Sequence, residues 1–139
     1  MQLPSKKKIL QQIPFDERLK QYGHEDTLFG FQLSQQDVSI QHIDNPLEHI
    51  QLESAKEFLN KTKKSITNLK YIHQHIESSS AFAKQVKLLN TYQQLKQWKL
   101  AGFFSLVFSS FEETIENNLL SDSPNLFLFD LYKLGQICK

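Results

Sequence analysis

The chain has little of what usually crosslinks a protein or divides it into parts: one cysteine, four glycines and four prolines in 139 residues. A single cysteine, Cys138, forms neither an internal disulfide nor a multi-thiolate zinc site, which favours a reducing, cytoplasmic location. The sequence also has no internal repeat and no low-complexity linker to mark a boundary. We therefore predict one helical domain over residues 1–139, a length that suits a single hydrophobic core.

Arginine is nearly absent, since fifteen of the sixteen basic residues are lysines and Arg18 is the exception. Arginine is the better-shaped group for contacts with phosphates and base edges, so its scarcity disfavours sequence-specific recognition of nucleic acid. The sequence has no P-loop, serine nucleophile elbow, dinucleotide fingerprint or zinc-protease motif. We therefore expect a protein that is not an enzyme, with no catalytic residue, cofactor or metal.

Long hydrophobic runs are missing as well. The longest uncharged apolar stretch, residues 100–111, lies between Lys99 and Glu112 and is shorter than the roughly 17–25 residues of a membrane-spanning helix. The lysines near the N-terminus are followed by Gln11, Gln12 and Pro14 rather than by the apolar segment of an export signal. We expect no membrane span and no export signal.

The strongest positive signal is a run of seam positions at alternating spacings of three and four, the pattern of a long helix packed along another. They are Leu52, Ala55, Leu59, Thr62, Ile66, Leu69, His73 and Ile76. A start signal comes from Asn45, Pro46 and Glu48, so the sequence predicts a helix over residues 45–77, then a turn at residues 78–80. A second helix from Ala81 to Leu120, with Gly102 as a kink or break, would complete a long antiparallel hairpin.

The remaining segments predict smaller elements. Residues 5–12 and 15–22 suit short helices, and the alternation of Phe29, Phe31, Leu33, Val38 and Ile40 predicts a small β-hairpin near residues 27–43. A final helix is expected over residues 124–137, after the turn at Ser121–Pro124. The predicted fold class is mainly α: a helical bundle with one long antiparallel helical hairpin and the small β-hairpin.

Several polar residues have more than one interpretation. His73, at a seam position, is either a half-buried histidine hydrogen-bonded across the bundle or a pH-sensitive, partner-specifying contact. His49 with Glu53 and His73 with Glu77 have spacings at which two side chains can share a metal ion, although the inward Glu-x-x-His pairs of di-iron bundles are absent. Glu112, Glu113 and Glu116 suggest a solvated acidic helix face.

Arg18 and His24 have the Arg-x5-His spacing used by the helical HEPN ribonucleases. The pair lies near the N-terminus and not late in a helical bundle, so the context departs from that family. A small helical RNase with an Arg-His pair is therefore kept only as an alternative function.

Charge is unevenly distributed, because residues 45–100 hold nine lysines and four glutamates whereas residues 101–139 hold two lysines and five acidic residues. Lysines on the middle helices, above all Lys61, Lys63 and Lys64, could form a face for nucleic acid, which is a second alternative function. Aromatic residues placed for base stacking are not evident among them.

Surplus apolar surface supports the leading hypothesis. Two segments near the C-terminus offer more large side chains than a chain of this size easily buries, and exposed apolar patches usually mark partner sites. The candidate partner-binding residues are Phe103, Phe104, Phe108, Phe111, Leu126, Phe127, Phe129 and Leu134. We expect a protein-protein interaction module, such as an adaptor, a chaperone or a subunit of a larger assembly, that binds another protein or itself as a homo-oligomer.

Overall fold

The computed structural model describes residues 22–36, 38, 41, 43–46 and 53–139. Within this part of the chain the fold is helical and contains no strand. Its helices are α2 (Glu25–Gln35), α3 (Ala55–His75), α4 (Ser79–Gln85), α5 (Lys87–Gln97), α6 (Ala101–Leu119) and α7 (Leu126–Cys138). The predicted short helix over residues 5–12 lies outside the described residues, as does the one over 15–22 except for Tyr22, which is not helical. The mainly helical fold class is thus confirmed.

The predicted β-hairpin is wrong, because its first strand falls in helix α2. Leu28 and Phe31 are the buried residues of α2, and their spacing of three places both on one helical face. The ring of Phe31 packs edge to face against Phe82 of α4, with centroids 5.3 Å apart. The alternation at Phe29, Phe31 and Leu33 therefore does not mark a strand, because the packing of one helical face of α2 decides the structure here.

Helix α3 begins later than predicted. Asn45 and Pro46 are not helical, and the start of α3 is a capping box at Ser54 and Glu57. The Ser54 hydroxyl accepts from the Glu57 backbone N–H at 3.3 Å, and the Glu57 carboxylate accepts from the Ser54 backbone N–H at 3.0 Å. This reciprocal pair satisfies two helix-terminal donors and fixes the first turn. Downstream, Leu59, Ile66 and Leu69 of the predicted seam are buried.

The second long helix of the predicted hairpin is instead divided into α4, α5 and α6, so the long antiparallel hairpin is not confirmed. The first break is at Val86, whose extended backbone lies between α4 and α5. The second is a Schellman-type end: Lys99 has a φ of +58°, and the Leu100 N–H donates to the Leu95 carbonyl at 2.8 Å. Gly102, expected as the breakpoint, lies in the first turn of α6.

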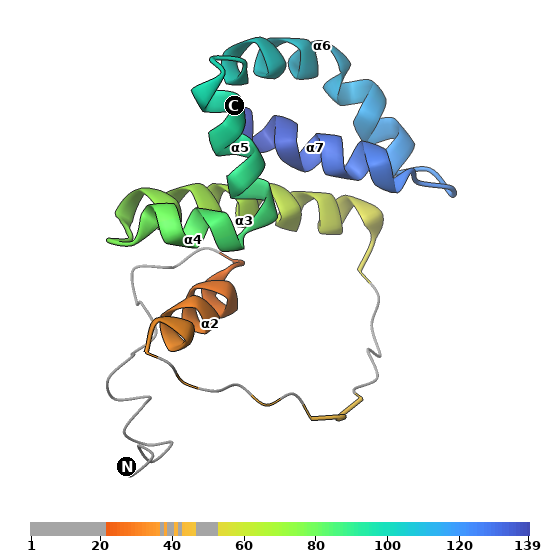
Figure 1. Cartoon of the computed structure of the whole chain (residues 1–139). Coiled ribbons are helices and arrows are strands. Elements are labelled where there is room, and N and C mark those ends of the chain that lie inside the picture. The colour runs from red at the N-terminus through yellow and green to blue at the C-terminus, as the bar shows by residue number, and fades with distance from the viewer. Residues whose placement is uncertain (1–21, 37, 39–40, 42, 47–52) are drawn as a thin grey trace, which may run out of the picture.

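Helices α6 and α7 form a short antiparallel pair on one side of α3, while α2 lies on the other side (Figure 1). The cap of α7 is Asn125, whose side-chain oxygen accepts from the backbone N–H groups of Phe127 and Leu128 at 2.8 and 3.4 Å. The predicted final helix is thus confirmed, with its start two residues later than expected.

Two apolar clusters hold these helices together, and α3 and α7 contribute to both. The first joins α2, α3, α4, α5 and the end of α7, through Leu28, Phe31, Ile66, Leu69, Ile72, Phe82, Ala83, Leu89 and Ile137. The second joins the start of α3 to α6 and α7 through Leu59, Phe108, Ile115, Leu119 and Tyr132. Among the described residues, no helix is both long and apolar enough to cross a membrane.

Candidate functional site

A groove of about 1020 Å³ lies beside the first half of α3. One wall is a single face of α3, which includes Phe58, Leu59, Thr62 and Ile66. The opposite wall comes from the start of α5, the end of α6 and the start of α7, and Tyr22 and His24 reach the groove from before α2. The site is therefore assembled from segments far apart in the sequence.

The apolar side chains of the groove differ in exposure. Leu59 is buried, whereas Phe58 is 51% exposed and Leu126 is 78% exposed. The rings of Phe58 and Phe129 lie 5.6 Å apart and bring α3 and α7 together within the groove. Because Asn125 caps α7, the position of Leu126 is fixed in the first helical turn. The groove thus presents exposed apolar groups above a buried apolar base.

Charged side chains line the groove beside the apolar ones: Lys61, Lys87, Lys133 and Glu53. Lys61 pairs with Glu53, and Lys133 pairs with Asp130 at 2.7 Å. These pairs neutralise Lys61 and Lys133, so the excess positive charge of the lining comes from Lys87, which is exposed and in no ion pair among the described residues.

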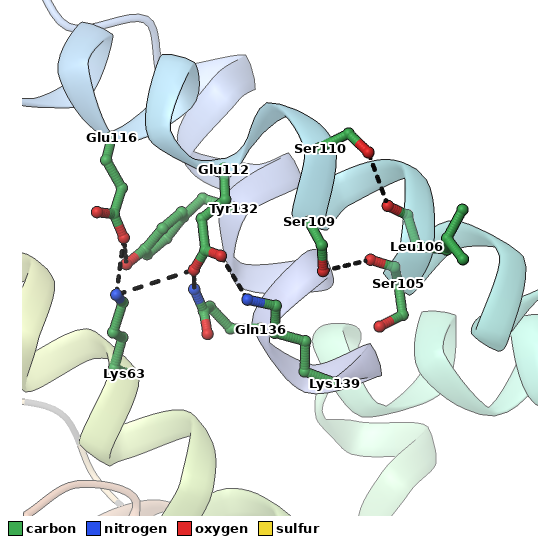
Figure 2. A network of polar contacts seen from close by, with 10 residues as sticks. All are labelled: Lys63, Ser105, Leu106, Ser109, Ser110, Glu112, Glu116, Tyr132, Gln136 and Lys139. Atoms are coloured by element: carbon green, nitrogen blue, oxygen red, sulfur yellow. Dashed lines mark hydrogen bonds and ion pairs between the residues drawn. The ribbon is translucent and has the colours of Figure 1, made fainter.

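A polar cluster, defined by Lys63, Glu112, Glu116, Tyr132, Gln136 and Lys139, lies where α3 meets α6 and α7 (Figure 2). Glu116 accepts a hydrogen bond from the Tyr132 hydroxyl at 2.9 Å and forms an ion pair with Lys63 at 2.7 Å. Glu112 accepts from the Gln136 amide at 2.6 Å and also pairs with Lys139. The prediction of a solvated acidic face is therefore wrong for Glu112 and Glu116, which connect three helices.

These contacts change the proton affinities of the groups in the polar cluster. Burial acts to raise the pKa of Glu112, but hydrogen bonds from Lys139 and Gln136 outweigh it, so that pKa is lowered. Burial raises the pKa of Tyr132 well above its ordinary value, and the hydrogen bond to Glu116 adds to the effect. Tyr132 is therefore a neutral structural donor and not an acid or base for catalysis near neutral pH.

The structure separates the predicted partner-binding residues into two groups. Phe108 is buried, and Phe104, Phe129 and Leu134 are half-buried against the two clusters, so these residues serve mainly as core. The exposed members are Phe103, Phe111, Leu126 and Phe127. Leu126 and Phe129 both line the groove, whereas Phe103 and Phe111 lie on α6 outside it.

The predicted nucleic-acid lysines are not equivalent. Lys61 and Lys63 both pair with carboxylates, and Lys64 is exposed. Arg18 and His49 lie outside the described residues, so the Arg-His pair and one of the metal pairs remain predictions. Within the described part of the chain, no three histidine, cysteine or acidic side chains gather as a metal site would require.

Among the histidines of the described chain, His24 and His73 have pKa values that the fold changes. Burial lowers the pKa of His24, partly opposed by the charges of Asp26 and Glu25. Burial also lowers the pKa of His73, partly opposed by the Ser79 backbone and reinforced by the charge of Lys96. His73 is half-buried, with its Nε2 3.3 Å from Gln93 Nε2 of α5, which matches the interpretation of a histidine bonded across the bundle.

Acidification is therefore expected to destabilise the fold below about pH 6.5, the ordinary histidine pKa. The unfolded chain binds protons at these two residues more readily than the folded chain does. Their contribution to the stability of the fold is therefore complete above that pH and is lost as the pH falls. Melting temperatures at pH 7.5 and 5.5 should show a smaller decrease for a double variant, His24→Asn and His73→Gln, than for the wild type. An equal decrease in both proteins would contradict this assignment.

Sequence reasoning missed most of the groove. Phe58, Val86 and Leu88 face it, but the groove exists only because the chain breaks at Val86 and turns between α6 and α7. The one available signal was the Ser54-x-x-Glu57 spacing, which marks where α3 starts. Comparisons with models of known families, with curated proteins and with solved structures find no match to this chain.

Proposed function

We propose that the chain is a non-enzymatic protein-interaction module that binds an amphipathic helix of another protein in the groove beside α3. The observation that supports this most is the exposure of Phe58 and Leu126 in the same groove as buried Leu59. Exposed apolar side chains gathered around a groove gain free energy when a partner covers them. Apolar grooves between helices are a common receptor for the apolar face of a partner helix.

The charge of the lining favours a partner of a particular kind. Exposed Lys87 lines the groove without an ion pair among the described residues, so an acidic residue that flanks the apolar face of the partner helix would be attracted to it. The expected partner segment has large apolar residues at positions i, i+3 or i+4, and i+7, with aspartate or glutamate at its edges. An adaptor, a chaperone or a subunit of a larger assembly could each use such a groove.

The two alternative functions have less support. The nucleic-acid alternative needs free lysines, and Lys63 is already paired with Glu116 at 2.7 Å and lies 3.9 Å from Glu112. The RNase alternative needs a reactive His24, and the His24 ring nitrogen Nδ1 lies 3.3 Å from the Thr27 hydroxyl beside the start of α2. A cytoplasmic location remains part of the proposal.

A peptide library tests the proposal. Random 16-residue peptides are displayed and selected on the wild-type protein, and the enriched peptides are measured against Leu126→Asp and Phe127→Asp. These neighbours are both exposed in the first turn of α7, but only Leu126 lines the groove. Losing the burial of one leucine should weaken binding by at least about tenfold.

The expected result is enrichment of amphipathic acidic peptides that bind Phe127→Asp as tightly as the wild type and Leu126→Asp at least about tenfold more weakly. Two results would overturn the proposal: no peptide enriched above background, or enriched peptides that bind both variants equally. Circular dichroism of both variants shows that each retains its helices.

A further inference from the structure

The outer face of α6 is apolar and lies away from both the groove and the core. Phe103 and Leu106 are 68% and 70% exposed, and Val107 and Phe111 are exposed beside them. None of these four residues lines the groove. In Figure 2 the Leu106 side chain extends away from the polar cluster, to which α6 contributes Glu112 and Glu116.

This face carries a seam of its own. Phe103, Leu106, Ser110 and Glu113 follow one another in α6 at spacings of three and four, which is the repeat of a helix that packs along a partner helix. Lys99 precedes this run in the turn between α5 and α6. The hydroxyls of Ser109 and Ser110 donate to the carbonyls of Ser105 and Leu106 at 2.9 and 3.3 Å (Figure 2). The serines are therefore already satisfied, and burying them leaves no donor unpaired.

The charges at the two ends of the seam are of opposite sign. Residues 100–111 carry no charge, with Lys99 before them and Glu112 and Glu113 after them. Glu112 is held by Gln136 and Lys139 on the other side of α6, whereas Lys99 and Glu113 are exposed and take part in no ion pair within the described chain. The seam is thus positive at its start and negative at its end.

We propose that a second copy of this chain covers the face, with the two α6 helices packed antiparallel about a two-fold axis at Leu106. In that arrangement Leu106 meets its own copy, and Phe103 lies over the small Ser109 of the other chain. Ser110 lies over Gly102, where a Cβ would meet nothing within 4 Å. Phe103 therefore faces a small side chain, and the contact of Ser110 with Gly102 leaves room for the two helices to approach closely.

Charge complementarity selects this partner and this direction. Lys99 lies just before the start of α6 and Glu113 lies within α6, and a second copy necessarily repeats that arrangement. An antiparallel pair brings each Lys99 to the Glu113 of the other copy, so two ion pairs form together. A parallel pair would place like charges side by side at both ends, which is unfavourable.

Sedimentation velocity over a range of protein concentrations tests the dimer with a charge-exchange set. The wild type should dimerise, and Lys99→Glu or Glu113→Lys alone should weaken dimerisation at least about fivefold, because each places two pairs of like charges at the interface. The double variant Lys99→Glu with Glu113→Lys should return the dissociation constant to within about twofold of wild type.

A further variant, Leu106→Glu, places two carboxylates at the two-fold axis and should be monomeric at every concentration, while circular dichroism shows its helices unchanged. A monomeric wild type, single variants that dimerise as the wild type does, or a double variant that stays weakened would each overturn the inference. This test of the dimer is independent of the peptide test of the groove, because Leu126 and Phe127, which the peptide test replaces, lie on α7 and not on the α6 seam.

Discussion

Replacing Phe82 with alanine is expected to lower the free energy of unfolding by about 3–5 kcal/mol, the usual cost of deleting a buried phenylalanine ring. Phe82 is fully buried in the first cluster and packs edge to face on Phe31. The truncation removes that ring contact and leaves a cavity between α2, α3 and α4, which the surrounding helices fill only in part. Helix α2 should loosen first, since Leu28 and Phe31 are its buried residues.

Urea unfolding followed by circular dichroism measures this loss, and amide hydrogen exchange locates it. The matched control is Phe127→Ala, because Phe127 is 67% exposed and lies outside both clusters. Its free energy of unfolding should stay within about 0.5 kcal/mol of wild type. If Phe82→Ala were as stable as the control, the first cluster would not be the core that holds α2.

Gly135→Ala is expected to destabilise the protein by about 2–3 kcal/mol through overpacking. A Cβ at position 135 would lie 2.2–2.5 Å from three carbons of the Phe108 ring, which is far inside van der Waals contact. Phe108 has little room to retreat, because its ring is buried and meets Tyr132 at a centroid distance of 6.0 Å. Helices α6 and α7 must therefore separate or the ring must leave its position.

The control for this prediction has the opposite sign. Gly30 lies inside α2, and a Cβ there would meet nothing within 4 Å, so Gly30→Ala should raise the free energy of unfolding by about 0.5–1 kcal/mol. Thermal unfolding of both variants gives the comparison. Adding Phe108→Leu to Gly135→Ala should recover part of the loss. Equal stability of the two alanine variants would contradict the close approach of α7 to Phe108.

Periodicity predicted the parts of the fold that local rules control. The seam from Leu59 to Leu69 lies on the buried side of α3, and the apolar run after Leu126 is a helix as its turn signals indicated. The breaks at Val86 and Lys99 could not be predicted, because neither position holds a glycine or a proline. Lys99 takes a left-handed conformation that is uncommon for a lysine and that closes the end of α5 through the Leu100 N–H.

The site was less accessible to sequence reasoning than the fold. Apolar surplus at α6 and α7 indicated a partner surface, yet periodicity could not tell that Phe108 is core while Phe103 and Leu126 are exposed. The ion pairs of Lys63 with Glu112 and Glu116 join residues about fifty positions apart, so the acidic segment looked solvated. The groove itself depends on where three helices end, which the sequence does not state.

The proposed function is the binding of another protein in the groove beside α3. The most direct measurement is quantitative affinity purification from nuclease-treated native extract with the wild type, Leu126→Asp and Phe127→Asp as baits. A partner should be recovered in near-equimolar amount with the wild type and Phe127→Asp, and lost with Leu126→Asp. Recovery of the same proteins with all three baits, or of the bait alone with the wild type, would contradict the proposed function.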